Sequence, residues 1–315
     1  MSLLSVVIPA FNEDQMISRM CDEVRRVLEG ADISYELVFV NDGSTDRTAE
    51  EIASQAAKDS RVTGVQFSRN FGKEAAILAG LAYATGDAAA VMDCDLQHPP
   101  ETLVEMYRKW QEGFQVVEGI KKNRGEESIF HRESAGFFYR IMSGIMKVDM
   151  ENTSDFKMLD RQVVKTVLSM PEQKLFFRAI SSWVGYRTTT VEFEVHERVA
   201  GMSKWTVGSL FRYAFTNIVS FTTIPLQFIS IAGGICFVGS LVLILYSLVQ
   251  YFRGHAVEGY TTTILVMLLI GSAIMLSLGI IGFYIARIYE EVRRRPRYIV
   301  SGIIKGNAGE TNDKK

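Results

Sequence analysis

The sequence contains few cysteines and no strong excess of either charge, and both absences narrow the range of functions. The three cysteines, Cys21, Cys94 and Cys236, form no C-x-x-C pair, so neither a zinc ribbon nor a disulfide framework is indicated and a reducing compartment fits. A formal net charge of −2 over 315 residues is not the basic balance of a nucleic-acid binder. MSLLSVVIPAFNED lacks a basic region before its short apolar run, so we expect no signal peptide and a cytoplasmic location for residues 1–200.

Glycine-rich phosphate-binding loops are also missing. No G-x-G-x-x-G follows the first apolar run, which argues against a dinucleotide dehydrogenase. No G-x-x-x-x-G-K-[ST] occurs, which argues against a P-loop ATPase. There is also no Ser or Cys constellation that predicts a covalent enzyme intermediate. A phosphate-binding site in this chain must therefore use other groups.

Long apolar runs are confined to the last third of the chain. Residues 226–252 and 260–286 contain no charged residue, and each run exceeds the roughly 20 residues that a bilayer-spanning helix needs. Buried core helices are the alternative, but two such runs in tandem favour a membrane hairpin. Five arginines follow the second run and one lies in the linking loop, so the positive-inside rule predicts a multi-pass protein of the inner (cytoplasmic) membrane with both termini in the cytoplasm.

The segments beside the apolar runs carry weaker signals. Residues 205–225 are rich in aromatics with one charge, which favours an interfacial amphipathic helix over a buried helix of the soluble domain. Residues 287–315 form a basic cytoplasmic tail, and we expect its polar end beyond Ser301 to be disordered. Small residues four apart, at Ser230 and Gly234, favour close helix packing within the hairpin or between subunits.

Short apolar runs alternate with helix-like stretches in residues 1–204. The runs LSVVIPA, YELVFVND, RVTGVQFS, AAAVMDCD and QVVEGI predict five buried strands. The intervening segments 14–28, 46–58, 73–84 and 100–112 have helical patterns. This alternation predicts an α/β, Rossmann-like domain with a mostly parallel sheet covered on both faces. Ligands of such sheets bind beyond the carboxyl ends of the strands.

The stretch DCDLQH ends the fourth predicted strand. Side chains alternate in an extended segment, so Asp93, Asp95 and Gln97 are expected on one side and Cys94 on the other. Two carboxylates and an amide oxygen suit Mg²⁺ or Mn²⁺, which bridge to substrate phosphates. Cys94 is then a packing residue, and His98 is either near the ligand or a loop hydrogen-bonding group.

The motifs SVVIPAFNE, VFVNDGSTDRT, SRNFGKEAAILAG and DCDLQHPPE together resemble family-2 glycosyltransferases with the GT-A (nucleotide-diphosphosugar transferase) fold. With the hairpin, about residues 3–300 resemble polyprenyl-phosphate glycosyltransferases. These include the dolichol-phosphate mannosyltransferase and bactoprenol glucosyltransferase groups, and RNFGKE with two spans matches the bactoprenol group better.

The resemblance implies a reaction and its partners. The enzyme would transfer a hexose, with glucose from UDP-glucose as the best guess, to undecaprenyl phosphate at the cytoplasmic membrane face. The configuration at the anomeric carbon would invert. The product would be a lipid-linked sugar donor for O-antigen-type glycan modification. GDP-mannose, UDP-N-acetylhexosamine, UDP-galactose and an aminoarabinose donor remain alternatives. The resemblance also implies a homo-oligomer formed through the membrane helices.

The resemblance further assigns residues to the donor site. Asp93, Asp95 and Gln97 match the metal-bearing motif, in which Asp95 serves catalysis by holding the metal on the leaving diphosphate. For Asp42, the alternative to a nucleotide contact is a role as a turn residue in NDGS. The residues implied at the nucleotide are Pro9, Phe11, Glu13, Asp42, Asn70, Gly72, Lys73 and Asp93.

Three downstream segments complete the implied site. Asp155 stands where the family has its catalytic base, although we expect it mainly to orient a lipid phosphate that is already largely deprotonated. The cations and hydroxyl of Arg198, Ser203 and Lys204 suit a lipid phosphate, with a juxtamembrane basic patch as the alternative. Lys121 and Arg124 are weaker candidates for a diphosphate contact, and a mobile loop is the alternative there.

Two other classes of protein stay open. A processive polysaccharide synthase needs a Q-x-x-R-W segment, whereas Gln173, Arg178 and Trp183 have the wrong spacing, and two spans do not readily form a polymer channel. A non-catalytic membrane protein that binds nucleotide has no need of the paired carboxylates. A lipid-directed hexosyltransferase is therefore the prediction.

Overall fold

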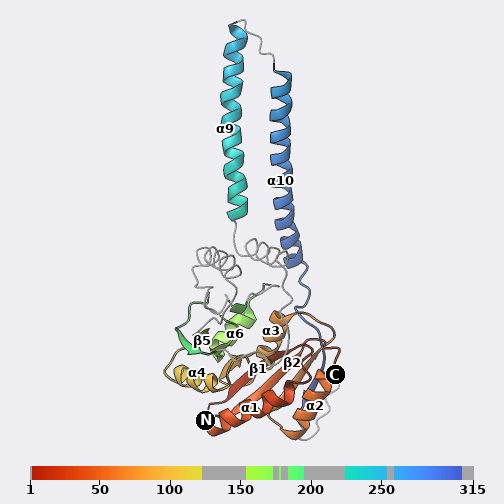
Figure 1. Ribbon diagram of the computed structural model, residues 1–315, viewed down its shortest axis with the longest axis vertical. Coiled ribbons are helices and arrows are strands. Elements are labelled where there is room, and N and C mark those ends of the chain that lie inside the picture. Colours follow the sequence, from red (N-terminus) through yellow and green to blue (C-terminus); the bar gives the residue numbers. More distant parts are fainter. Residues whose placement is uncertain are drawn as a thin grey trace. The chain divides into compact units, whose positions relative to one another are not determined.

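The computed structural model describes residues 2–122, 154–172, 177–178, 184–194, 224–253 and 259–306. The chain divides into two units, which we describe separately. The first comprises Met1–Lys204 with Arg295–Lys315, and the second comprises Trp205–Arg294. The first unit contains the sheet and its helices, and the second contains two long helices (Figure 1).

An eight-stranded sheet in the order β7-β5-β6-β4-β1-β2-β3-β8 forms the centre of the first unit. Its four middle strands, β4, β1, β2 and β3, are parallel, whereas β6 and β8 run antiparallel to their neighbours. The strands are β1 Leu4–Ala10, β2 Tyr35–Asn41, β3 Val62–Phe67, β4 Ala88–Val91, β5 Val116–Lys121, β6 Lys157–Asp160, β7 Thr188–Phe193 and β8 Val300–Lys305.

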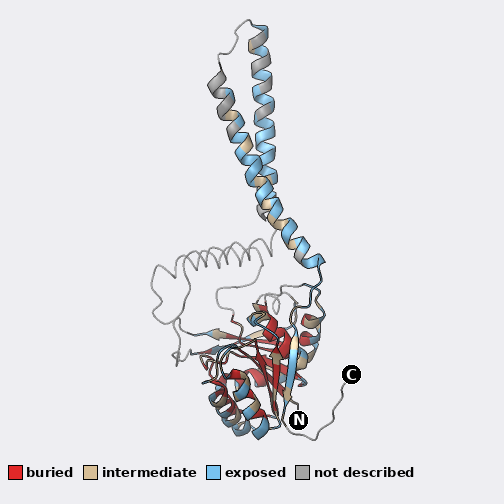
Figure 2. Ribbon diagram, turned by 90° about the vertical axis from the view of Figure 1, so that its right-hand side faces the viewer, coloured by how far each residue is buried: buried red, intermediate tan, exposed pale blue. Residues whose placement is uncertain are grey.

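Helices cover both faces of this sheet. The helices α1 (Ile17–Gly30), α2 (Thr48–Lys58) and α4 (Glu101–Gln111) share one buried cluster with Val6 and Ile8 of β1. The helices α3 (Lys73–Tyr83) and α6 (Arg161–Ser169) share the other cluster with Val7. Because both faces are covered, β1 is apolar almost throughout, as buried parallel strands are, and the buried residues gather around the sheet (Figure 2).

The strand order reverses at β1. The chain passes from β1 to β2 and β3 on one side and then returns to place β4 on the other side of β1. A crevice forms at such a switch point, beyond the carboxyl ends of the strands. The segments that follow β1 and β4, residues 11–16 and 92–100, therefore border one crevice.

The predicted mostly parallel α/β domain is confirmed, including the five predicted strands and four helices within a few residues. One detail was wrong, because β4 ends at Val91 and Asp93–Asp95 form a turn instead of a strand end. Leu96 has a φ of 56°, which breaks the extended alternation that the sequence suggested. The strands β6, β7 and β8 and the helix α6 were not predicted.

The end of the chain also differs from expectation. Residues 302–315 were predicted to be disordered, but residues 302–305 belong to β8, which pairs antiparallel with β3. Gly64 of β3 makes this packing possible, since a Cβ there would lie 2.5 Å from Ile52 and 3.3 Å from Ile304. The apolar residues Ile303 and Ile304 thus belong to a strand at the edge of the sheet.

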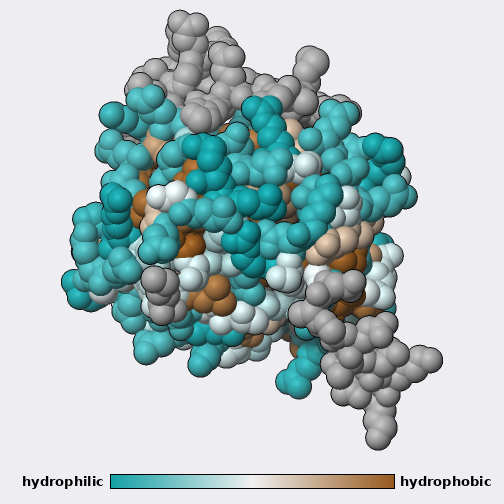
Figure 3. Space-filling view, turned by 90° about the horizontal axis from the view of Figure 1, so that it is seen from below, coloured by the Kyte–Doolittle hydropathy of each residue, from teal (hydrophilic) through white to brown (hydrophobic). Residues whose placement is uncertain are grey.

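The second unit contains α9 (Ile224–Phe252) and α10 (Tyr260–Val292). Each includes a window long and apolar enough to cross a bilayer, Leu226–Leu243 with mean hydropathy 2.0 and Leu269–Tyr289 with 2.1. None of either window is buried, so the alternative of soluble core helices does not hold for the described residues (Figure 2). The face of the first unit that Figure 3 shows is, in contrast, mostly hydrophilic with small apolar areas. The predicted interfacial helix falls, up to residue 223, outside the described residues.

Replacing Gly80 of α3 with alanine tests the packing of α3 on the sheet. Alanine normally stabilises a helix interior relative to glycine. Here its Cβ would lie 2.2 Å from Cγ1 of Val7, which is fully buried and cannot move aside. We expect Gly80→Ala to lower the free energy of unfolding by about 1–3 kcal/mol, measured by denaturant unfolding. Gly30→Ala, with no atom within 4 Å, is the control, and an equal loss there would contradict the packing argument.

Candidate active site

One pocket lies at the crevice beyond the carboxyl ends of β1 and β4. It contains every residue predicted for the nucleotide and both carboxylates of the DCD motif, whereas Gln97 is not among its lining residues. Phe11 is 46% exposed at this pocket, so one face of an aromatic ring is open to a ligand. The predicted residues that line it are Pro9, Phe11, Glu13, Asp42, Asn70, Gly72, Lys73, Asp93 and Asp95.

Asp42 fixes one wall of the pocket. Its carboxylate accepts hydrogen bonds from the backbone N–H groups of Phe71, at 2.6 Å, and Gly72, at 2.9 Å. Burial raises the pKa of Asp42, and these two hydrogen bonds offset part of that rise. Gly43 permits the close approach, because its φ is +67° and a Cβ there would lie 2.4 Å from the backbone of Arg69. Asp42 is therefore an anchor for the loop before α3, whereas Asn41 makes the side-chain bond of the NDGS turn, with its Oδ1 accepting from the N–H of Ser44.

Lys73, the first residue of α3, joins two acidic side chains. Its Nζ lies 2.7 Å from Oδ1 of Asp93 and 2.9 Å from Oδ2 of Asp155. Burial alone would lower the pKa of Lys73, but the charges of Asp93 and Asp155 outweigh burial and raise it. Lys73 is therefore a permanent cation that links the DCD turn to the start of β6.

Arg178 is the site residue that the sequence analysis missed. Its Nε and Nη2 each lie 3.3 Å from the carboxylate oxygens of Asp155. Burial would raise the pKa of Asp155, but the charges of Lys73 and Arg178 hold it well below the usual range. Asp155 is therefore ionised at any physiological pH and is a weak base. Its two cationic neighbours make it an anchor for positive charge.

Several buried groups hold Arg178 in place. Its backbone oxygen accepts a hydrogen bond of 2.8 Å from Nζ of Lys157, which also lies 2.6 Å from Oε1 of Glu118. The N–H of the neighbouring Phe177 donates to Glu74 at 2.9 Å. Burial raises the pKa of Glu74 to about 7 despite this hydrogen bond and the nearby Lys73 and Arg178. No local motif predicts this arrangement, because Glu74, Glu118 and Arg178 lie far from Asp155 along the chain.

The DCD turn also has a buried side. His98 stacks on Phe156 with ring centroids 4.7 Å apart, and its Nδ1 accepts from the N–H of Asp93 at 3.5 Å. Cys94 is 3% exposed within the apolar core. Cys94 is therefore a packing residue, as predicted, and His98 takes the loop hydrogen-bonding role.

The acidic residues of the pocket suit a hard divalent cation that is shared with a phosphate ligand. Asp93 and Asp95 offer only oxygen donors, and Asp93 already binds the cationic Lys73. Gln97 helps to hold the carboxylate of Asp95, because its backbone N–H donates to Oδ1 of Asp95 at 3.1 Å. Within the described ranges no three His, Cys, Asp or Glu side chains form a metal-binding group. Phosphate oxygens would have to complete the coordination, which is how Mg²⁺ is usually held.

The remaining predicted residues lie apart from this pocket or outside the described structure. Lys121 is exposed at the end of β5 and is not among the lining residues of the pocket. Arg124, Arg198, Ser203 and Lys204 lie outside the described residues, so their roles stay predictions.

The model of the family described as glycosyl transferase family 2 matches residues 5–168, which include the whole pocket. The chain belongs to glycosyl transferase family 2. The bactoprenol glucosyl transferase derived from the SfII prophage of Shigella flexneri is 38% identical over 309 residues, covering 96% of this chain and 99% of the relative. The glycosyltransferase YkcC of Bacillus subtilis is 38% identical over 298 residues, which cover 94% of this chain and 92% of the relative.

Solved structures of other glycosyltransferases share the fold. Glucosyl-3-phosphoglycerate synthase from Mycobacterium tuberculosis, crystallised with Mn²⁺, UDP and glucosyl-3-phosphoglycerate, superposes with a TM-score of 0.53. The match covers 69% of this chain and 78% of that chain at 19% identity. At this identity the likeness concerns the fold alone, which agrees with the predicted GT-A architecture.

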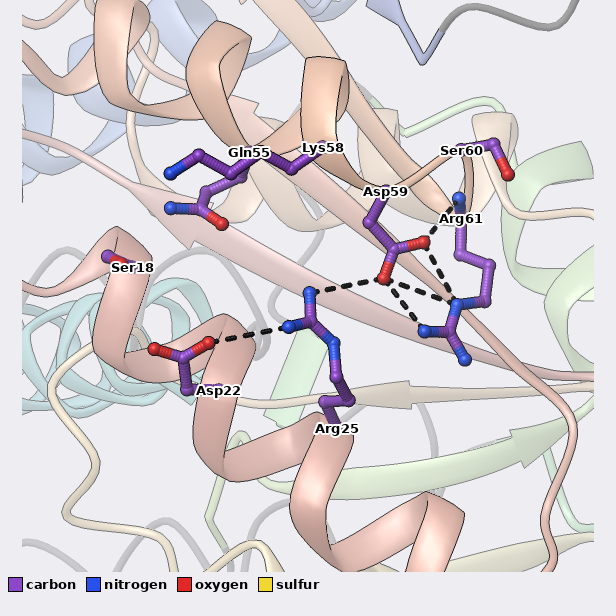
Figure 4. Close-up of a pocket in the computed structure, with 8 residues that line it drawn as sticks. All are labelled: Ser18, Asp22, Arg25, Gln55, Lys58, Asp59, Ser60 and Arg61. Atoms are coloured by element: carbon purple, nitrogen blue, oxygen red, sulfur yellow. Dashed lines mark hydrogen bonds and ion pairs between the residues drawn. The ribbon is translucent and has the colours of Figure 1, made fainter.

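This family-2 glycosyl transferase also has a second, polar hollow between α1, α2 and the start of β3 (Figure 4). There the carboxylate of Asp59 lies 3.2 Å from Arg25 and 2.8 Å from Arg61. Hydrogen bonds from Arg61 outweigh burial and lower the pKa of Asp59 to about 2. The ion pairs of Asp59 with Arg25 and Arg61 therefore tie together the two helices and the strand.

Asp59→Asn tests that role through acid stability. The folded-state pKa lies below the unfolded value of about 3.9, so the stabilisation is complete above that value and disappears as pH falls through about 2. We expect a loss of about 1 kcal/mol near neutral pH, reduced by the partly exposed arginines, that vanishes toward pH 2. Denaturant unfolding over this range measures it. Asp22→Asn, with a side chain 65% exposed, should change little, and an equal effect would contradict the assignment.

Proposed function

We propose that this protein transfers glucose from UDP-glucose to a polyprenyl phosphate at the cytoplasmic face of the membrane. The observation that carries the proposal is the pocket at the switch point of the sheet, where Asp93 and Asp95 lie beside the cationic Lys73. Such a pocket offers both the carboxylates for a metal and the positive charge for a diphosphate. The Shigella relative, named a bactoprenol glucosyl transferase and matched over 99% of its length, supports both the sugar and the lipid.

A divalent cation, Mg²⁺ or Mn²⁺, is the cofactor in this proposal. The Mycobacterium tuberculosis enzyme of the same fold was crystallised with Mn²⁺ and UDP-glucose, which supports this choice. Asp93 and Asp95 would hold the ion, with Gln97 beside them. When bound, such an ion neutralises the negative charge that develops on a leaving diphosphate.

The residues around the ion would bind and orient the donor. The exposed face of Phe11 suits stacking on the base, and Glu13 and Asp42 offer acceptors to ribose hydroxyls or a ring N–H. Lys73 and Arg178, fixed by Asp155, bring two positive charges to the same region. These charges suit the phosphates of both the donor and the acceptor.

The reaction needs no covalent enzyme intermediate. An oxygen of the lipid phosphate attacks the anomeric carbon, the bond from this carbon to the diphosphate breaks, and the nucleoside diphosphate leaves with the electron pair. The configuration at the anomeric carbon inverts. Since a phosphate monoester has a second pKa of about 6, the acceptor needs little help in losing its proton. Asp155 therefore serves by holding Lys73 and Arg178.

The membrane arrangement follows from the two partners. A nucleotide sugar is soluble and a polyprenyl phosphate is not, so α9 and α10 would keep the enzyme at the bilayer. In this proposal both termini lie in the cytoplasm, and Arg198, Ser203 and Lys204 receive the lipid phosphate. Lys121 and Arg124 remain weaker candidates for the diphosphate, and the helices could join copies of the chain.

A donor panel tests the reaction. The full chain in detergent, with Mn²⁺ or Mg²⁺ and undecaprenyl phosphate, is offered UDP-glucose, UDP-galactose, UDP-N-acetylglucosamine and GDP-mannose. We expect metal-dependent transfer of sugar to the lipid, with UDP-glucose the best donor. Asp95→Asn should lower the rate on the order of 100-fold or more, because a carboxylate at the metal is lost.

The control for this panel is Asp87→Asn, which makes the same chemical change at an exposed residue beside the amino end of β4. It should retain wild-type transfer. If another donor is used instead, the proposed sugar is wrong, but the proposed class of reaction stands. Absence of transfer from all four donors, together with absence of metal-dependent nucleotide binding, would overturn the proposal.

The pH profile of Asp155→Asn separates an anchor from a base. If Asp155 only holds Lys73 and Arg178, the rate should fall on the order of 100-fold through misplacement of these groups. That deficit should stay constant between about pH 6 and 9, since the acceptor phosphate loses its proton by itself. Transfer rates at saturating donor measure it, again with Asp87→Asn as control. If the transfer rate of the variant instead approaches that of the wild type as pH rises, Asp155 removes a proton.

A further inference from the structure

The chain returns to the sheet immediately after the second apolar helix. The helix α10 ends at Val292, and β8 begins at Val300. Between them, Arg297 donates a hydrogen bond to the backbone oxygen of Met170, and the backbone oxygen of Ile299 accepts from the N–H of Ser68 at 3.0 Å. The segment after the membrane hairpin is therefore bound to the first unit before β8 begins.

Tyr298 lies at the centre of this attachment. Its ring stacks on that of Phe67, the last residue of β3, with centroids 5.1 Å apart and planes 12° apart. Phe67 in turn contacts Phe71 edge to face, with centroids 5.6 Å apart. The register between β3 and β8 shifts between Gln66 and Phe67. The regular pairing of the two strands is therefore interrupted where the stack forms. Aromatic contacts thus hold the end of β3 where regular backbone pairing is interrupted.

The stack leads directly to the donor pocket. Phe71 belongs to the loop between β3 and α3, whose N–H groups at Phe71 and Gly72 bind Asp42. Asn70, Gly72 and Lys73 of this loop line the pocket. A shift of Phe71 would therefore move both the wall of the pocket and the lysine that bridges its carboxylates.

We propose that Tyr298 is a positioning residue for the donor site, which acts through Phe67 and Phe71 on the Asn70–Lys73 loop. The segment that follows the second apolar helix then supports the nucleotide pocket from outside, through Phe67 and Phe71. The inference rests on the proposed function only in that the pocket binds a nucleoside diphosphate.

The physical reason is that Asp42 holds this loop through its backbone N–H groups, whereas aromatic packing holds the side chain of Phe71. Phe71 is half-buried and has its ring between Phe67 and the guanidinium of Arg69, which lies 4.0 Å from its centroid. Without the Tyr298 ring, Phe67 loses its cover on the solvent side and the Phe71 contact loses its fixed partner. Aromatic pairs of this geometry stabilise by more than their buried area alone. The loop would then sample more conformations, and a ligand would have to order it on binding.

Two measurements on the full chain in detergent test the proposal. The first is hydrogen exchange of the Phe71 and Gly72 amides in the absence of ligand, followed by mass spectrometry. The second is the dissociation constant of UDP in the presence of Mn²⁺, measured by calorimetry. Tyr298→Ala should speed exchange at both amides and weaken UDP binding about three- to tenfold. Tyr298→Phe keeps the ring and should behave as the wild type.

The matched control is Ile303→Ala, which truncates a 46% exposed side chain on the edge strand β8 that follows Tyr298, where Ile303 pairs with Val65. It should leave both the exchange at the Asn70–Lys73 loop and the UDP affinity unchanged. If Tyr298→Ala does not fold, Tyr298→Leu removes the ring but keeps apolar bulk, and the same direction of change is expected. Exchange elsewhere, such as in α1, should not change in the variants that fold.

The outcomes separate this inference from the proposed function. Faster exchange at the loop in Tyr298→Ala alone, with weaker UDP binding, supports the positioning role. Unchanged exchange at the two amides overturns it, whatever the nucleotide affinity. If the wild type does not bind UDP, the donor assignment fails, and the exchange measurement still decides whether Tyr298 positions the loop.

Discussion

The cation of Lys73 between Asp93 and Asp155 is the interaction on which the rest of the site depends. It joins three segments, the start of α3, the turn after β4 and the residues before β6, at distances of 2.7 and 2.9 Å. Two carboxylates held near each other repel, so the lysine stabilises their approach while leaving Asp95 beside them in the pocket. The pocket nevertheless keeps an acidic excess, since the described residues that line it set Glu13, Asp42, Asp93 and Asp95 against the single cation of Lys73, and this excess suits a divalent cation.

A second, buried layer of charge supports this bridge. Lys157 is fully buried and binds both Glu118 and the backbone oxygen of Arg178, which positions the arginine against Asp155. Burying a charged pair is costly unless every partner is satisfied, so such a network survives where it fixes a functional geometry. From the opposite side, Asp42 and the aromatic stack of Tyr298 fix the loop that carries Lys73. Electrostatic contacts and aromatic packing thus both hold the segments that line this pocket.

Most of the fold and much of the site could be predicted because their signals are local. The apolar runs of β1 and β2 and the helical patterns after them needed only neighbouring residues, and strand ends meet at one edge of any parallel sheet. The prediction failed where distant residues decide the conformation. The tail of residues 302–315 is polar as a whole, yet residues 302–305 pair with β3, where Gly64 leaves room for Ile304.

By itself the sequence determined the class of the protein: an α/β domain with paired carboxylates after the fourth strand, followed by two apolar helices. Only the tertiary structure decided what Asp155 does, because its pKa depends on Lys73 and on Arg178, which is 23 residues away along the chain. It also decided that Tyr298 stacks on Phe67, which in turn contacts Phe71 of the loop before α3. A motif records which groups are available, whereas their charge state and position depend on neighbours that folding brings together from distant parts of the chain.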